Sequence, residues 1–225
     1  MRLRPLTDQC PKPLLDLAGR PIITYVMDHL LNAGVDRFIV NTHYRPEMYP
    51  QKFPDLHYRG WPIIFRYEPV LLDTAGGLKN IEDLLVDDEA IICHNGDVIA
   101  DFSLMELLRY HDRKRPDATL ILRSRGPLLN VSVDAQGDIC DIRNTLGNPG
   151  LQRCLFSGIY AVETSILQHI QAGTIESIIA TFLKRIKAKP GSIAGVLIDE
   201  GNWHDIGSIE AYENLKAQAT GLEGR

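Results

Sequence analysis

The sequence predicts an α/β fold with a mostly parallel sheet, helices on both faces and a small antiparallel insertion, in a single domain over residues 1–225. Three observations support this fold class. Short β-rich runs alternate with helical ones, as in βαβ units. The run "AIICHNGD" (90–97) opens with continuously apolar residues, which is typical of a strand covered on both faces. The stretch "NVSVDAQGDICDI" (130–142) indicates a hairpin around Gln136-Gly137 and therefore an antiparallel insertion.

The helices are predicted from apolar spacing and from their start and stop residues. Pro21 suits the first position of a helix over residues 21–33, and Gly34 suits its end. The apolar face of this helix comprises Ile22, Ile23, Val26 and Leu30. Ser103 and Glu106 form a capping-box pattern that predicts a helix to about residue 113. Further helices are expected over residues 75–85, 164–171, 174–188 and 208–219.

The strands are predicted where short apolar, β-branched runs lie between these helices. They are expected over residues 37–42, 62–68, 90–97, 118–123, 155–162 and 193–199. Two strands of the hairpin at 130–142 complete the set. We find no internal repeat, low-complexity tract or long linker in the sequence, so a single domain is the simplest interpretation.

The composition restricts the partners and the compartment. The net charge of −5 gives no electrostatic case for binding nucleic acid or an anionic membrane. There is no apolar run long enough to span a bilayer and no secretory h-region after Met1, so a cytoplasmic location is expected. The cysteines lack CxxC spacing, so neither a zinc site nor a redox pair is predicted, and we expect them to serve packing: Cys10, Cys93, Cys140 and Cys154.

Two acidic motifs could hold a hard cation. In "HNGDV" (94–98), Asp97 follows an apolar strand, where ligands of open α/β sheets gather. In "NWHDIGS" (202–208), Asp205 lies in a loop before a helix. Magnesium sites for phosphates commonly use one or two carboxylates together with the phosphates of the substrate. The alternatives are an ordinary Asn-Gly-Asp turn in the first motif, and capping of the helix by Asp205 or Ser208 in the second.

Two further motifs could contact phosphates or a base. In "LLDTAGGLKN" (71–80), two glycines open a helix whose free N–H groups suit an anion or the polar edge of a base. A tight turn is the alternative. The opening stretch carries Arg2, Arg4 and Lys12, and Pro11 and Pro13 hold it extended. Cations on such a stiffened segment suit a phosphate chain, and a solvated basic terminus is the alternative.

Together these motifs resemble one family. "RLRPLTDQCPKPLLDLAGRPI" (2–22) is similar to the signature of the sugar-1-phosphate nucleotidylyltransferases, and "DTAGGL", "NGD", "FSGIY" and "WHDIG" follow in the family's order and at its spacings. The resemblance covers nearly the whole chain and implies a Rossmann-like, GT-A-like nucleotidyltransferase sheet. The short length and the "WHDIGS" ending resemble N-acetylmuramate-1-phosphate uridylyltransferases, and mannose-1-phosphate guanylyltransferase-like proteins are the nearest rival.

The resemblance implies a reaction in which a sugar 1-phosphate oxygen attacks the α-phosphorus of a nucleoside triphosphate and pyrophosphate leaves, with Mg²⁺ as cofactor. The leading expectation is UTP plus N-acetylmuramate 1-phosphate giving UDP-N-acetylmuramate, as in peptidoglycan recycling. Alternatives are mannose-1-phosphate guanylyl transfer and glucose-1-phosphate nucleotidylyl transfer. An inactive nucleotide-sugar-binding regulatory module is the alternative of another class. The oligomeric state stays open.

The resemblance also implies roles for single residues. Asp97 and Asp205 match the metal ligands, Arg2 the arginine that contacts the triphosphate, and Lys12 the lysine that contacts the reacting phosphate. Residues expected to bind the nucleotide are Thr74, Ala75, Gly76, Gly77, Asn95 and Gly96. Residues expected to face the sugar are Ser157, Gly158, Glu200 and Asn202.

Two features depart from the family pattern. Many thymidylyl- and uridylyltransferases carry a Glu-Lys pair where this chain has "DIRNT" (141–145), which weakens a hexose-specific thymidylyl interpretation. The family also has a strand and a Gly-rich loop before the signature, whereas this sequence starts within it, so a strand of ~5–6 residues is expected to be missing. The intact motifs favour a start further upstream. A truncated chain would be expected to have low stability and little catalysis, because the triphosphate would lose its anion nest.

Overall fold

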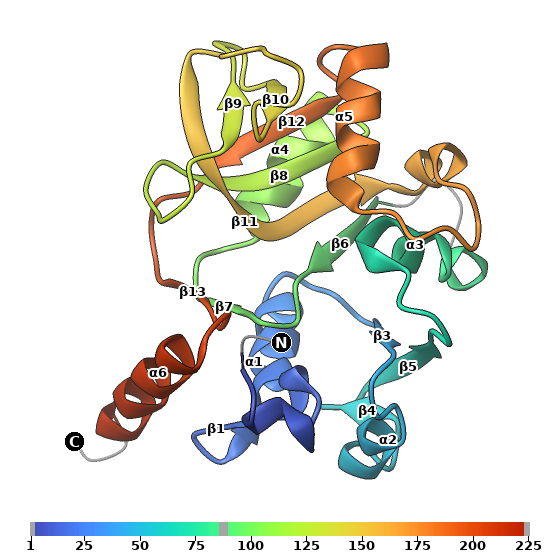
Figure 1. The fold of residues 1–225 in the computed structure, drawn as a ribbon, viewed down its shortest axis with the longest axis vertical. Coiled ribbons are helices and arrows are strands. Elements are labelled where there is room, and N and C mark those ends of the chain that lie inside the picture. Colours follow the sequence, from blue (N-terminus) through green and yellow to red (C-terminus); the bar gives the residue numbers. More distant parts are fainter. Residues whose placement is uncertain (1–2, 86–89, 223–225) are drawn as a thin grey trace. The chain divides into compact units, whose positions relative to one another are not determined.

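The computed structural model describes residues 3–85 and 90–222 (Figure 1). Its backbone contacts divide the chain into two compact units, and each is described by itself. The first unit comprises Met1–Tyr67, Asn95–Phe102 and Gly201–Arg225. The second comprises Glu68–His94 and Ser103–Glu200. In the described part of the chain, no helix has the length and apolar character needed to cross a membrane.

The first unit begins with the signature segment and contains three small sheets. Its 3₁₀ turns are η1 (Leu6–Asp8) and η2 (Lys12–Leu14), and its helices are α1 (Ile22–Leu31), α2 (Met48–Lys52) and α6 (Ile209–Leu222). Its strands are β1 (Asp16–Leu17), β2 (Arg20–Pro21), β3 (Phe38–Thr42), β4 (His57–Tyr58), β5 (Trp61–Tyr67), β7 (Val98–Ala100) and β13 (Trp203–Asp205). β3 pairs with β5 in parallel, whereas β1–β2, β4–β5 and β7–β13 are antiparallel.

Two apolar clusters form the core of this unit. One packs α1 against the β3–β5 sheet and α2: Leu14, Ile23, Met27, Phe38, Tyr49, Phe53 and Ile63. The other packs the signature segment against the residues that follow β13: Leu3, Leu15, Leu17, Ile22, Ile206 and Tyr212. The apolar positions of the signature are therefore core positions, and they hold this segment in place.

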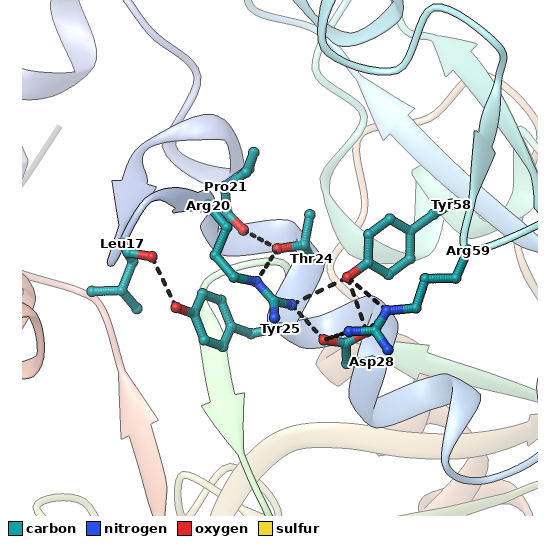
Figure 2. Close-up of polar contacts among 8 residues, drawn as sticks. All are labelled: Leu17, Arg20, Pro21, Thr24, Tyr25, Asp28, Tyr58 and Arg59. Atoms are coloured by element: carbon teal, nitrogen blue, oxygen red, sulfur yellow. Dashed lines mark hydrogen bonds and ion pairs between the residues drawn. The ribbon is translucent and has the colours of Figure 1, made fainter. Parts of the chain in front are cut away.

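A polar cluster fastens the β1–β2 hairpin, which forms the end of the signature segment, to α1 and β4 (Figure 2). Arg20 on β2 donates from Nε to Thr24 Oγ1 on α1 at 2.8 Å and forms an ion pair with Asp28. Asp28 also accepts a bond from Tyr58 at 2.9 Å and pairs with Arg59. Because one carboxylate joins two guanidinium groups and a phenol, it ties the β1–β2 hairpin and α1 to β4, which lies 30 residues further along the chain.

The second unit is built on a six-stranded sheet. Its helices are α3 (Asp73–Lys79), α4 (Met105–Lys114) and α5 (Ile178–Ala188), and its 3₁₀ turns are η3 (Glu82–Leu84) and η4 (Thr164–His169). Its strands are β6 (Ala90–His94), β8 (Ala118–Arg123), β9 (Val131–Val133), β10 (Ile139–Ile142), β11 (Gln152–Glu163) and β12 (Ile193–Leu197). The strand order is β10-β9-β11-β8-β12, and β6 pairs with β11.

Helices cover this sheet on both faces, as predicted. Figure 1 shows α5 in front of the strands and α4 behind them. Five of the six residues of β8 are buried, as required for a strand covered on both sides. The apolar run at 90–97 was expected to show such cover, but the residues of β6 are exposed or only partly buried. The sheet is mixed, because β12 is parallel to β8 while β11 runs antiparallel to β6, β8 and β9. β11 enters the sheet from the β9–β10 hairpin rather than through a helical crossover, which leaves it antiparallel.

The α/β class, the insertion hairpin and most predicted elements are confirmed, with differences at the ends. The α3 helix stops at Lys79 rather than near residue 85, and residues 164–169 form a 3₁₀ turn instead of an α-helix. Ser103 Oγ accepts a bond from the Met105 N–H at 3.3 Å, two residues on, so the predicted capping box with Glu106 does not form. The four cysteines are free thiols, and burial raises the pKa of Cys93 to about 12.

Candidate active site

The signature lysine meets the carboxylate of the "NGD" motif within the first unit. Pro11 is extended (φ −56°, ψ 138°) and leads into the single turn of η2, which carries Lys12. Lys12 Nζ lies 2.6 Å from Asp97 Oδ2, and the two side chains are 24% and 35% exposed. Pro13 lies against Gly96, where an added Cβ would be 3.5 Å from Pro13 Cγ. Two motifs distant in the sequence therefore form one partly exposed ion pair.

The second acidic motif is brought beside the first by the β7–β13 ladder. Asp205 pairs with Val98, and the Ile206 N–H donates to the Asp97 carbonyl at 2.9 Å. Ile206 is fully buried in the cluster that contains the signature residues. The alternative in which Asp205 caps the next helix is not needed, because the Ser208 hydroxyl accepts the Ala211 N–H at 3.1 Å. The two predicted metal ligands thus lie on neighbouring segments.

Tyrosine hydroxyls hold the backbone of the signature segment. Tyr25 on α1 donates to the Leu17 carbonyl at 2.8 Å (Figure 2). Tyr212 on α6 donates to the Asp16 carbonyl, and Tyr44 donates to the Asp8 carbonyl at 2.5 Å. These bonds fix the chain on both sides of Lys12. A segment fixed in this way can present a cation without first paying the entropy of ordering it.

The donor set at Asp97 and Asp205 fits a hard divalent cation. Carboxylate oxygens are the ligands that Mg²⁺ prefers. Among residues 3–85 and 90–222 there is no group of three or more His, Cys, Asp or Glu side chains that could hold a metal alone. The pair would therefore hold Mg²⁺ only with water and phosphate oxygens as further ligands, which is how Mg²⁺ is usually bound beside a phosphorylated substrate.

The glycine motif at the start of α3 is packed against the loop before α5, both in the second unit. The N–H groups of Ala75 and Gly76 donate to the Glu176 carbonyl at 2.8 and 3.2 Å. The Thr74 hydroxyl accepts the Ile178 N–H at 2.8 Å. The expectation that the N–H groups at this helix start are free is therefore wrong for these two, because a neighbouring loop supplies the acceptor. A base-lining role for Thr74 to Gly77 stays a prediction.

Replacing Gly76 by Ala is expected to lower the free energy of unfolding by about 1–3 kcal/mol, the usual cost of overpacking a filled site. An added Cβ would lie 2.3 Å from the Thr174 carbonyl oxygen and 2.9 Å from Leu72 Cβ. One of these neighbours is backbone, so relief requires a shift of the loop. Chemical denaturation followed by circular dichroism measures the change, and an unchanged midpoint would show that the loop yields without cost.

The "FSGIY" motif forms a β-bulge in β11. The register between β11 and β8 shifts between Phe156 and Tyr160, and Gly158 has φ +83°. Ser157 is buried, and its hydroxyl accepts the Ile159 N–H at 3.3 Å. Ile159 in turn pairs with His94, the last residue of β6 before the "NGD" motif in the chain. Bulges often lie next to active sites, where they redirect a side chain. Contact of Ser157 and Gly158 with the sugar stays a prediction.

Of the remaining predicted site residues, Asn95, Glu200 and Asn202 form hydrogen bonds within the chain. Asn95 accepts the Val98 N–H at 3.2 Å through its carbonyl, so the "NGD" motif is a tight turn as well as the partner of Lys12. The Glu200 carbonyl accepts a bond from Arg123 at 3.2 Å. The Asn202 amide donates to Asp101 at 2.7 Å. Arg2 lies outside the described residues.

The "DIRNT" stretch (141–145), where the resemblance implied a Glu-Lys pair that this sequence lacks, organises its own loop. The Asp141 carboxylate is fully buried and accepts the N–H groups of Thr145, Leu146 and Asn148 at 2.9–3.1 Å. Burial alone would raise the pKa of Asp141, but these backbone donors together lower it. Asp141 is therefore a buried charged carboxylate whose hydrogen bonds come from the backbone N–H groups of its own loop.

The motifs in the sequence did not point to Asp101, an acidic residue that directly follows β7 in the first unit. Asp101 accepts the backbone N–H of Asn202 at 2.6 Å, in addition to the Asn202 side-chain bond. The sequence contains no spacing signal for this contact, because it depends on the pairing of β7 with β13.

Comparison with known proteins identifies relatives along almost the whole chain. The model of the family described as "Nucleotidyl transferase" matches residues 1–221. A mannose-1-phosphate guanylyltransferase of Mycobacterium tuberculosis is 29% identical over 214 residues, and a mannose-1-phosphate guanyltransferase of Gibberella zeae is 32% identical over 223 residues. Each alignment covers 94% of this chain and 59% of the relative, so the chain spans about three fifths of the length of these proteins.

Solved structures share the fold at lower identity. HddC from Yersinia pseudotuberculosis superposes with a TM-score of 0.78 at 19% identity, over 96% of this chain and 93% of HddC. A second structure of HddC is a complex with GMP-PN. A putative glucose-1-phosphate thymidylyltransferase from Bacillus anthracis also gives 0.78, at 17% identity, over 97% of this chain and 90% of that chain. These similarities establish the fold.

Proposed function

The chain belongs to the nucleotidyl transferase family, and from this premise we propose that it transfers a nucleotidyl group from a nucleoside triphosphate to a sugar 1-phosphate, with release of pyrophosphate. The observation that carries the proposal is the convergence of three motifs in the first unit. Lys12 pairs with Asp97 at 2.6 Å, and the residue after Asp205 is bonded to the Asp97 carbonyl. A cation and two carboxylates on rigid segments are the groups that phosphoryl-type transfer requires.

In the proposed reaction, an oxygen of the sugar 1-phosphate forms a bond to the α-phosphorus as the bond from that phosphorus to the bridging oxygen of pyrophosphate breaks. Asp97 and Asp205 would hold Mg²⁺, and a bound Mg²⁺ stabilises charge on phosphate oxygens. Lys12 would contact the phosphate at the reacting centre, since it is held next to Asp97. The chain's main contribution is to position the two substrates and neutralise their charge.

The proposed first substrate pair is GTP and mannose 1-phosphate, because the relatives aligned over 94% of this chain are named as mannose-1-phosphate guanylyltransferases. The second pair is UTP and N-acetylmuramate 1-phosphate, which the "WHDIGS" motif (203–208) favours. The missing Glu-Lys pair at residues 141–145 makes glucose-1-phosphate thymidylyl transfer a weaker alternative.

A pyrophosphate-release assay over a matrix of nucleoside triphosphates and sugar 1-phosphates tests the proposal. We expect release that requires Mg²⁺, a triphosphate and a sugar 1-phosphate together, with GTP and mannose 1-phosphate as the best pair. A preference for UTP and N-acetylmuramate 1-phosphate would keep the reaction and change the substrates. A folded chain without turnover for any pair, but with a melting temperature raised by a nucleotide-sugar, would identify a binding module instead.

A further inference from the structure

The carboxylate of Asp101 forms hydrogen bonds with Asn202, the residue that directly precedes β13. Asp101 Oδ1 accepts the Asn202 backbone N–H at 2.6 Å, and Oδ2 accepts the Asn202 side-chain amide at 2.7 Å. The Asp101 N–H also donates to the Asn202 carbonyl at 3.3 Å. Three bonds thus join one pair of residues, and two of them are charge-assisted. The side-chain bond from Asn202 lowers the pKa of Asp101, so its carboxylate is charged at neutral pH.

The surroundings hold Asp101 and Asn202 in register. The next residue, Phe102, is buried, and its carbonyl lies 2.6 Å from His29 Nε2 on α1. On the other side, Gly201 has φ +67°, and an added Cβ there would lie 2.5 Å from Asp101 Oδ1. Only a residue without a side chain permits this close approach in that backbone conformation. The positions of Asp101 and Asn202 are therefore fixed by the residues next to each of them.

The β7–β13 ladder is short, so its register depends on hydrogen bonds outside the ladder. Three residue pairs form it: Trp203 with Ala100, His204 with Ile99, and Asp205 with Val98. An isolated two-stranded ladder of this length is at best marginally stable. A slip by one residue would turn every side chain of β13 to the opposite face, Asp205 included. The Asp101–Asn202 pair closes the end of the ladder opposite Asp97 and Asp205.

We propose that Asp101 and Asn202 are positioning residues that set the register of β13 and thereby keep Asp205 beside Asp97 for a divalent cation. This inference rests on the proposed function for the role of the two carboxylates. In this role the side-chain amide of Asn202 donates to Asp101 and thereby supports the ladder. Contact of Asn202 with the sugar stays a prediction.

The test uses an exchange of the two side chains in the full chain. Asn202→Asp sets two carboxylates against each other and is expected to break the grip. The double variant Asp101→Asn with Asn202→Asp carries the same charge as the wild type and restores complementary bonds, since the new amide donates to the new carboxylate. Asn214→Asp, which adds the same charge to an exposed position of α6, is the matched control.

Two readouts separate the inference from the proposed function. The first is hydrogen–deuterium exchange of the amides of residues 203–206, with β8 as internal reference. The second is Mn²⁺ affinity in the presence of a non-hydrolysable nucleoside triphosphate analogue, from the paramagnetic resonance signal of free Mn²⁺. For Asn202→Asp we expect faster exchange at 203–206 and Mn²⁺ binding weakened by about 10-fold or more, the size of effect seen when the residues that orient a metal ligand are disturbed.

The double variant is expected to return both readouts to within about twofold of the wild type, since an amide–carboxylate hydrogen bond between residues 101 and 202 is restored. Unchanged exchange and unchanged Mn²⁺ affinity in Asn202→Asp would overturn the inference, as would a double variant no better than the single one. If the wild type released no pyrophosphate with any substrate pair, the proposed function would fail, and the exchange readout would still judge the grip on β13.

Discussion

Replacing Asp97 by Asn is expected to lower kcat for pyrophosphate release by about 100-fold or more, the loss typical of removing one preorganised electrostatic group from an active site. Asn keeps the shape of the side chain but removes its charge and one hard oxygen donor for Mg²⁺. The pair with Lys12 is only partly buried, with side chains 24% and 35% exposed. Its loss should therefore cost at most about 1 kcal/mol of unfolding free energy. Steady-state kinetics and thermal unfolding measure the two effects.

Matched variants decide whether the effect belongs to the site. Asp205→Asn is expected to behave like Asp97→Asn, because both carboxylates are proposed to hold the same ion. Asp112→Asn on α4 is the control: that carboxylate also pairs with a cation, Arg115, but lies on an exposed helix face. Rates near those of the wild type in either Asp97→Asn or Asp205→Asn would remove that residue from the metal role. A large drop in the melting temperature of a variant would show that its activity was lost because the chain no longer folds.

The elements that the sequence predicted well are the long and strongly patterned ones. The helix at residues 22–31 has an apolar face and follows a proline, and β8 is a short strand of mostly apolar residues that is buried at five of its six positions, so local pattern and tertiary environment agree. The short strands β1, β2, β4, β7 and β13 have two or three residues each and carry no periodicity of their own. These strands form because another segment of the chain pairs with them. A local sequence pattern does not contain that information.

The same limit applies to the site. Lys12, Asp97 and Asp205 were identified from their motifs, but spacing along the chain could not show that they meet. Their proximity comes from the β7–β13 ladder and from the burial of Ile206 among signature residues. The N–H groups of Ala75 and Gly76 were expected to be free, since a helix start has no internal acceptors for them. A carbonyl a hundred residues away, at Glu176, satisfies them, and only the fold reveals it.

Replacing Lys12 by Gln is the second change expected to have a large effect: kcat should fall by about 100-fold, again the loss of one preorganised charge at a phosphate. Lys12 is on a fixed turn, and its ammonium is 2.6 Å from Asp97 Oδ2. Phosphate oxygens that enter beside Asp97 would meet this cation at once. Without it, the negative charge of the leaving pyrophosphate and of Asp97 would lack a fixed counter-charge, so the transfer step itself should slow.

Two companion variants make the Lys12 result specific. Arg4→Gln removes another cation from the same segment, but Arg4 pairs with exposed Asp8 at 3.1 Å, and we expect nearly unchanged kcat. Lys12→Arg keeps the charge but replaces a compact ammonium by a planar fork, so an intermediate rate is expected. If Lys12→Gln raised KM for the triphosphate and left kcat intact, Lys12 would bind the ground state and transition state equally, and the proposed contact at the reacting phosphate would be wrong.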